Sequence, residues 1–206
     1  MVSAYAGLRP LLRRGRSKAA SDISREHAIF EDRDGLISVT GGKLTTHRAM
    51  AEEVGELLAR RLGRPRASVT RDRPLGPPIR PLKEFMDLGF DEETALRLQR
   101  RYAPEQVRRH LGAPSAAERL VPARPHTWVE VEIAVHEEMA MTLDDVLVRR
   151  LGLFYETPDQ GVHVAEAVAE RIGGILGWDP ARTEREINAY ENLVRAHQGF
   201  RVDHGG

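Results

Sequence analysis

Two glycines and a lysine, Gly41, Gly42 and Lys43, stand between a β-prone run and a predicted helix. Glycine lets the backbone approach a ligand closely and take a positive φ. The helix start behind them offers unpaired N–H groups and the positive end of the helix dipole. Together with the ammonium of Lys43 and the hydroxyl of Thr45, this turn suits a phosphate, a carboxylate or an electron-rich cofactor ring. A glycine turn that only feeds a capped helix, with Lys43 in solvent, is an equal alternative on local chemistry.

A second candidate for anion binding is Arg9, which lies between apolar neighbours and directly before Pro10. The proline holds the residue before it in an extended conformation. An arginine on a stiff segment can clamp a phosphate or carboxylate with two parallel hydrogen bonds. When Arg9 is considered alone, the favoured interpretation is an ordinary salt bridge or a hydrogen bond to a backbone carbonyl.

Other clusters of reactive side chains favour structural roles. His136 and Glu137 lack the H-E-x-x-H spacing of a helical zinc site, so no metal site is expected. Asp144 and Asp145 follow Thr142, where acidic residues favour a helix start. The arginine pairs 100–101 and 108–109 have acidic neighbours and indicate a solvated surface. We expect Trp128 and Trp178 in the core or in an interface.

The composition excludes several classes of function. The 206 residues hold 31 Lys plus Arg and 31 Asp plus Glu, so a globally basic surface for nucleic acid is excluded, and no nucleic-acid partner is expected. Cysteine is absent, which removes disulfides, thiol nucleophiles and cysteine metal sites. No apolar run approaches the length of a membrane helix. We expect a cytoplasmic protein, and peripheral contact with the cytoplasmic face of the membrane stays open.

The elements that must position these residues divide the chain in two. Residues 1–62 should form a β-hairpin from runs 27–30 and 36–39, the Gly-Gly-Lys loop and a helix over 45–62, with Thr45 or Thr46 as cap and Gly63 as stop. Five prolines within 63–81 predict a linker. Residues 82–206 should be all helical.

Apolar spacing and capping residues place helices in this last part. Helices are expected over 92–103, 128–140 and 162–176, from Thr142 onward, and from the Asp179-Pro180 cap. The helix over 128–140 should carry Val131, Val135 and Met139 on one face. The helix from Thr142 should bury Val146, Leu147, Leu151 and Phe154. The fold class is therefore α+β and mostly α: a C-terminal helical bundle preceded by a small hairpin and helix.

The segment YAGLRPL at 5–11, followed by LISVTGGKLTT at 36–46, resembles FAD-dependent glycerol-3-phosphate dehydrogenase and its relative α-glycerophosphate oxidase. The pair in this order and spacing is much more specific than either motif. AVHEEMA at 134–140 and TLDDVLVRR at 142–150 resemble the helical C-terminal domain of the same family. The resemblance covers nearly the whole chain and is weakest over 63–125.

The resemblance implies oxidation of glycerol 3-phosphate to dihydroxyacetone phosphate, with hydride transfer to FAD and onward transfer of electrons to quinone or oxygen. It implies catalytic roles for Arg9 and Lys43, with Arg9 beside the substrate hydroxyl. It also implies that Gly41, Gly42, Lys43, Leu44 and Thr45 form a loop along the flavin. His47 stands where relatives often show tyrosine, which leaves its role open.

The G-x-G-x-x-G motif that such enzymes use to bind the ADP part of FAD is missing. The chain therefore resembles only the C-terminal portion of the family enzyme, and residues 1–62 a remnant of its FAD-binding α/β domain. We expect the isolated chain to be inactive and not to retain FAD. An apolar strip on the hairpin and the following helix should be exposed and lead to self-association or to local disorder before residue 63. The alternative is a non-catalytic helical module for oligomerisation or interaction that needs a partner chain.

Overall fold

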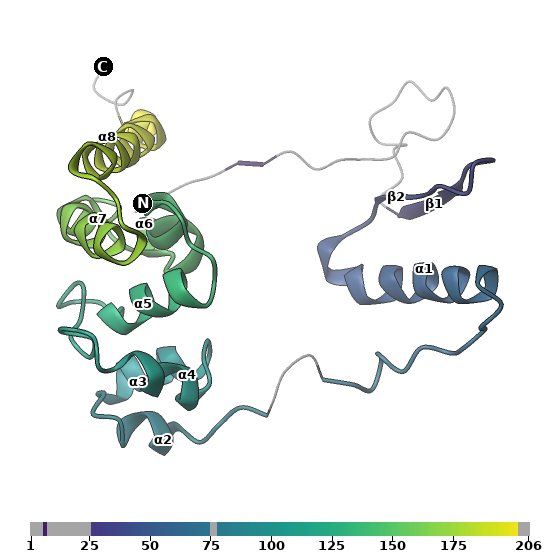
Figure 1. Cartoon of the computed structure of the whole chain (residues 1–206), viewed down its shortest axis with the longest axis horizontal. Coiled ribbons are helices and arrows are strands. Elements are labelled where there is room, and N and C mark those ends of the chain that lie inside the picture. Colours follow the sequence, from purple (N-terminus) through teal and green to yellow (C-terminus); the bar gives the residue numbers. More distant parts are fainter. Residues whose placement is uncertain (1–5, 8–25, 75–77, 202–206) are drawn as a thin grey trace. The chain divides into compact units, whose positions relative to one another are not determined.

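The computed structural model describes residues 6–7, 26–74 and 78–201, and Arg9 lies outside them. The chain divides into two compact units at residues 77 and 78. We call the described residues 26–74 the hairpin unit and 78–201 the helical unit. The predicted fold class, mostly α with a small two-stranded sheet, is confirmed (Figure 1).

The hairpin unit holds strands β1 (His27–Glu31) and β2 (Ile37–Gly41), the short 3-10 helix η2 (Leu44–Thr46) and helix α1 (His47–Arg61). The strands pair antiparallel, with Ile29 opposite Val39. Helix α1 ends as predicted at Gly63, whose φ is +67°. The N–H of Gly63 donates to the carbonyl of Arg60, and that of Arg64 to the carbonyl of Ala59, which is the hydrogen-bond pattern of a Schellman cap.

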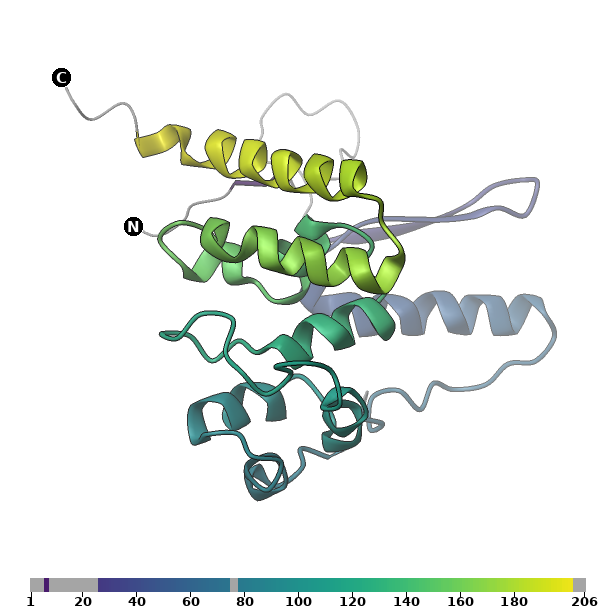
Figure 2. The ribbon, with the colours of Figure 1, turned by 60° about the vertical axis from the view of Figure 1, so that its left-hand side comes forward.

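The helical unit carries the hydrophobic core of the described chain. Its helices are α2 (Leu82–Met86), α3 (Glu92–Gln99), α4 (Pro104–His110), α5 (Trp128–His136), α6 (Leu153–Glu156), α7 (Val162–Leu176) and α8 (Pro180–His197), with a π-helical segment η3 (Asp145–Arg150) and a short 3-10 helix η4 (Gln198–Arg201). Helices α7 and α8 lie side by side at one end of this unit and α2 to α4 at the other, with α5 between them (Figures 1 and 2).

Helix α5 is buried on all sides because it joins two hydrophobic clusters. Val129 and Ile133 pack with residues of α2 to α4, whereas Val131 and Val135 pack with residues of α6 to α8. Trp128 and Trp178 pack at the edge of the second cluster, as predicted, and each has an arginine over its ring.

A buried glutamate of this helix is held by an arginine of α3. Both carboxylate oxygens of Glu130 accept from Nε of Arg97, at 2.9 and 3.1 Å, and the same side chain caps its own helix through the N–H of Thr127. Nη2 of Arg97 donates to the carbonyl of Leu151 at 2.8 Å, so one guanidinium connects α3, α5 and the segment after η3. His126 lies beside this pair, fully buried, with Nε2 3.2 Å from the same carbonyl.

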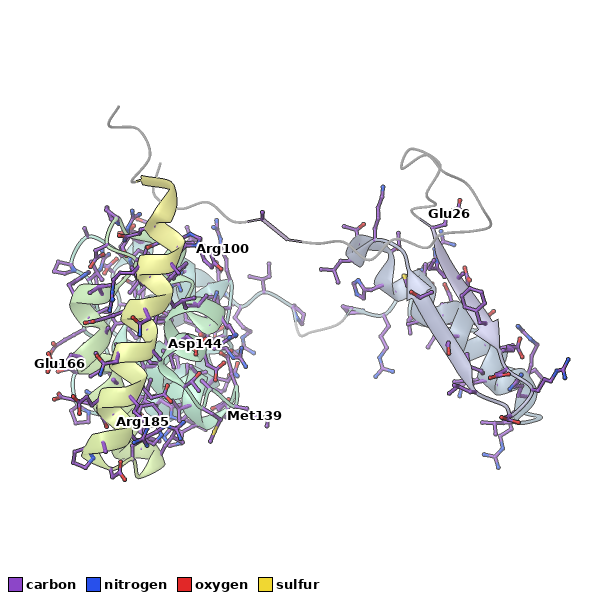
Figure 3. The ribbon with its side chains drawn as sticks, turned by 90° about the horizontal axis from the view of Figure 1, so that it is seen from above. Glu26, Arg100, Met139, Asp144, Glu166 and Arg185 are labelled. Carbon is purple, nitrogen blue, oxygen red and sulfur yellow. The ribbon has the colours of Figure 1, made fainter. Side chains whose placement is uncertain are left out.

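Three predicted helices end earlier than expected. The helix from 128 stops at His136, and Met139 takes a φ of +57° with its side chain 81% exposed at the surface (Figure 3), so its predicted place on the buried face was wrong. The helix from 92 stops at Gln99, because Pro104 begins the separate helix α4. The helix after Thr142 is interrupted at Gly152, which has a φ of +73°.

Other predictions for this unit are confirmed. Helix α7 covers the predicted 162–176, and the carboxylate of Asp179 caps α8 through the N–H of Arg182. The side chains of Val146, Leu147, Leu151 and Phe154 are buried.

The first prediction concerns the buried ion pair. Arg97→Met should lower the free energy of unfolding of the helical unit by about 3–5 kcal/mol, because the buried Glu130 would lose the closer of its two arginine partners and keep only Arg101, whose Nε is 3.7 Å from one of its oxygens. The matched control is Arg195→Met, because Arg195 is exposed and its guanidinium lies as far as 4.0 Å from the carboxylate of Glu191. It should change the free energy of unfolding by no more than about 0.5 kcal/mol. Urea denaturation followed by circular dichroism measures both. Equal effects of the two variants would contradict the assignment.

The second prediction concerns pH. Burial, together with the positive charge of Arg97, lowers the pKa of His126 from 6.5 to about 3. The unfolded chain therefore binds a proton at this residue below about pH 6.5, while the folded chain stays neutral there. The free energy of unfolding should fall as the pH falls from about 6.5 towards about 3. His126→Gln should weaken this dependence between about pH 7 and about pH 5, measured by urea denaturation. An unchanged slope would argue against a buried neutral imidazole.

Candidate functional site

The Gly41-Gly42 turn ends strand β2 in a conformation that requires glycine at both positions. Their φ angles are +77° and +82°. A Cβ atom on Gly41 would lie 2.7 Å from the carbonyl oxygen of Glu26, which lies just before β1 (Figure 3). A Cβ atom on Gly42 would lie 2.8 Å from Sδ of Met50 on α1. The turn therefore needs glycine at both positions for its backbone conformation, and at Gly41 also for its close contact with the backbone before β1.

Lys43 follows in an extended conformation and leads directly into η2. Its carbonyl accepts from the N–H and the hydroxyl of Thr46, at 3.0 and 2.8 Å. Its ammonium has no hydrogen bond or ion pair to any residue of the described ranges. Leu44 and Thr45 are also exposed, and 88% of Leu44 is accessible. A free cation thus stands beside the first N–H groups of a helix, an arrangement that suits an anionic group.

Helix α1 holds this turn against the hairpin through polar contacts, one of which is an ion pair. Nε2 of His27 on β1 is 2.9 Å from a carboxylate oxygen of Glu53, and Arg61 pairs with Glu31. Nη1 of Arg61 also donates to the carbonyl of Gly35 in the hairpin turn, at 3.2 Å. These contacts place α1 along one face of the hairpin, with its N-terminus next to the Gly-Gly turn.

One turn contains Gly41, Gly42, Lys43, Leu44 and Thr45, and their proximity follows from their adjacent places in the sequence. The structure does not test their predicted roles, and the predicted proximity of Arg9 and Lys43 stays a prediction because Arg9 lies outside the described residues. His47 begins α1, and its Nδ1 lies 2.8 Å from the carbonyl of Leu44, so this side chain braces the loop. Thr46 is the N-cap residue, but its side chain bonds the carbonyl of Lys43 instead of a helix N–H.

A groove of about 990 Å³ between α1 and residues 66–74 was not predicted. Ala51 contributes a methyl group and Gly55 bare backbone to its wall, and Arg48 donates across it to the hydroxyl of Thr70 at 3.1 Å. The repeated arginines of 64–73 could have indicated a polar surface beside α1, but the prolines around them indicated only a linker. The predicted division into 1–62, a linker over 63–81 and 82–206 stays a prediction.

The charged clusters of the helical unit have structural partners. Glu137 accepts from Gln106, Arg109 and His110, and these hydrogen bonds, that from Gln106 foremost, lower its pKa to about 2. Asp145 accepts from the N–H groups of Met141 and Thr142, which confirms its role at a helix start. Over the described ranges there is no group of three potential metal ligands and no helix that is long and apolar enough to cross a bilayer.

The third prediction tests the need for glycine in the turn. Gly41→Ala should destabilise the hairpin unit by about 1–3 kcal/mol, because alanine at positive φ is strained and its methyl group would meet the Glu26 carbonyl. Gly55→Ala on α1 is the matched control, because it points into open space and should stabilise the helix by about 0.5–1 kcal/mol. Hydrogen exchange of the amides of 27–61 measures both. The same sign for both variants would refute the geometry.

Comparison with known proteins places this geometry in a family. The family described as the C-terminal domain of alpha-glycerophosphate oxidase matches residues 79–183. Glycerol-3-phosphate dehydrogenase 2 of Mycobacterium tuberculosis is 33% identical over 93% of this chain and 34% of its own length. The aerobic glycerol-3-phosphate dehydrogenase of Staphylococcus haemolyticus is 28% identical over 97% of this chain and 40% of its own length.

A solved structure shares the fold. The glycerol-3-phosphate dehydrogenase from Bacillus halodurans, complexed with FAD, matches 82% of this chain and 37% of its own chain with a TM-score of 0.62 and 23% identity. The chain thus spans a little over a third of the length of the relatives that it matches. The predicted resemblance is confirmed, and this chain belongs to the family of the C-terminal domain of alpha-glycerophosphate oxidase.

Proposed function

We propose that this chain is the C-terminal part of an FAD-dependent glycerol-3-phosphate dehydrogenase and supplies one wall of its active site. The observation that carries the proposal is the Gly-Gly-Lys turn, in a chain that is similar along 93% of its length to a glycerol-3-phosphate dehydrogenase. In that site Gly41 to Thr45 line FAD, and Arg9 and Lys43 are the catalytic residues that contact the substrate.

The residues of the turn fit such a ligand. The two glycines let the turn pack closely against β1 and α1. The Lys43 ammonium, which has no hydrogen bond or ion pair within the described residues, would meet the phosphate of the substrate or an electron-rich edge of the cofactor. Leu44 gives an exposed apolar side chain beside it. When bound, FAD supplies the acceptor for the hydride that glycerol 3-phosphate loses. Arg9 and Lys43 together would neutralise the charge of the substrate and orient its hydroxyl group.

One wall cannot hold the reactants in the geometry for hydride transfer, and correct positioning is worth about 7–11 kcal/mol of the barrier. The proposed activity therefore needs the rest of the family fold, which binds the ADP part of FAD. The electron acceptor beyond FAD is a quinone or oxygen, and the proposed compartment is the cytoplasm, including the inner face of the membrane.

The fourth prediction uses a chimaera in which this chain replaces the matching C-terminal third of the M. tuberculosis dehydrogenase. It should bind FAD and oxidise glycerol 3-phosphate with an artificial electron acceptor, whereas the chain alone should show neither a flavin absorption band nor turnover. Lys43→Met in the chimaera should lower kcat about 100-fold or more, because a cation would be missing where charge develops.

The matched control is Lys83→Met, which removes an exposed lysine of the helical unit that pairs with Asp87. It should leave FAD binding and turnover unchanged. A yellow chain with a flavin spectrum on its own would refute the incomplete pocket. Full activity of the Lys43→Met chimaera would refute the role of Lys43.

A further inference from the structure

The groove between α1 and residues 66–74 carries positive charge that the chain itself does not neutralise. Apart from His47, its ionisable lining residues are four arginines and two glutamates, so two positive charges are in excess. Arg66, Arg71 and Arg73 are exposed, and none of the three has a hydrogen bond or an ion pair to any other described residue. Their guanidinium groups are therefore available to an anion that enters the groove.

The fourth arginine, Arg48, builds the groove instead of offering a free charge. Its Nη1 donates to a carboxylate oxygen of Glu52 at 3.0 Å and to the hydroxyl of Thr70 at 3.1 Å. The hydroxyls of Ser68 and Thr70 lie 2.9 Å apart, and the Ser68 hydroxyl accepts from the N–H of Thr70 at 3.2 Å. This chain of hydrogen bonds holds the segment around Thr70 against α1, so side chains of the protein itself fix the wall of the groove.

Part of the lining is apolar. Ala51, Gly55, Val69 and Pro74 line the groove together with the arginines, and Val69 is 58% exposed. The volume of about 990 Å³ lies at the upper end of the range of about 300–1,000 Å³ that is typical of sites for small molecules. Guanidinium groups beside an apolar wall suit a molecule that has both an anionic group and an apolar part.

The amount of excess charge indicates which anionic group fits. A phosphomonoester carries a charge of about −1.5 to −2 near pH 7 and has three acceptor oxygens, and guanidinium groups bind such oxygens through pairs of parallel hydrogen bonds. A single carboxylate would leave one of the two excess cations without an anion. The arginines line a groove that a whole small molecule can enter, which favours a soluble ligand over the headgroup of a lipid.

We propose that this groove binds a soluble phosphomonoester that has an apolar part. The phosphate lies among Arg66, Arg71 and Arg73, and the apolar part lies against Ala51 and Val69. The site is separate from the Gly-Gly-Lys turn, and none of its five residues has a role in the proposed function.

The test titrates the full 206-residue chain, without FAD, with 2-naphthyl phosphate and follows binding by calorimetry. Inorganic phosphate, glycerol 3-phosphate and 2-naphthol are the comparison compounds, because each lacks either the apolar part or the phosphate. 2-Naphthyl phosphate should bind at least tenfold more tightly than each of them. Hydrogen exchange should show that it protects the amides of 66–73 and of α1, while the amides of α7 stay unchanged.

Variants at exposed positions locate the site. The double variant Arg71→Met and Arg73→Met should weaken binding of 2-naphthyl phosphate at least tenfold. Ala51→Trp should do the same, because it fills the groove without changing its charge. The matched control is Arg33→Met, which removes an exposed arginine of the hairpin turn outside the groove and should leave the affinity unchanged. Lys43→Met should also leave it unchanged, because the Gly-Gly-Lys turn is a different site.

Four outcomes would overturn the proposal. The first is no binding of 2-naphthyl phosphate, and the second is equal affinity for inorganic phosphate or glycerol 3-phosphate. The third is an equal loss of affinity in Arg33→Met or Lys43→Met and in the double variant. The fourth is displacement of the probe by phosphatidylcholine vesicles that contain phosphatidic acid, which would assign the groove to a lipid headgroup. Because no readout uses FAD or turnover, the proposed function can fail while this site stands.

Discussion

The ion pair between Arg97 and the fully buried Glu130 is the interaction on which the helical unit depends. It places a carboxyl group inside helix α5, whose other buried side chains are apolar apart from Glu132, and it ties that helix to α3 and to the backbone at Leu151. A buried carboxylate is tolerated only where a partner and further hydrogen bonds satisfy it. Glu130 has both, because Arg97 binds its two oxygens and the N–H of Thr127 donates to one of them. The position of α5 then fixes the two hydrophobic clusters on either side.

The hairpin unit follows the opposite principle. Its conformation is specified by two glycines at positive φ, a Schellman cap and a few partly exposed polar contacts between the hairpin and α1, and no residue of 26–74 is buried. Local signals of this kind select a conformation but contribute little free energy, since the dominant stabilising term is burial of apolar surface. The proposed ligand-binding wall therefore rests on contacts that contribute little free energy by themselves. That is consistent with a chain that spans about a third of its relatives.

Much of the fold could be predicted because strong local signals agree with the tertiary structure. Asp179 and Pro180 start α8, Gly63 ends α1, and apolar spacing defines α7. Predictions failed where a short-range break competes with apolar spacing. Met139 continues the stripe of Val131 and Val135, yet the helix has already ended. For the candidate site, the turn was found from its residue types, whereas the groove beside α1 joins segments whose contact no local pattern shows.

The sequence by itself determined the family, the fold class, the Gly-Gly-Lys turn and most helix starts, because capping residues, glycines and apolar periodicity act over a few neighbouring residues. The tertiary structure decided which charges are buried, that α5 lies at the centre of the helical unit, and that no residue of 26–74 is buried. These features depend on contacts between segments far apart in the chain, such as Arg97 with Glu130 and Arg61 with Glu31. Residue types indicate that such partners exist, but only the folded backbone determines which of them meet.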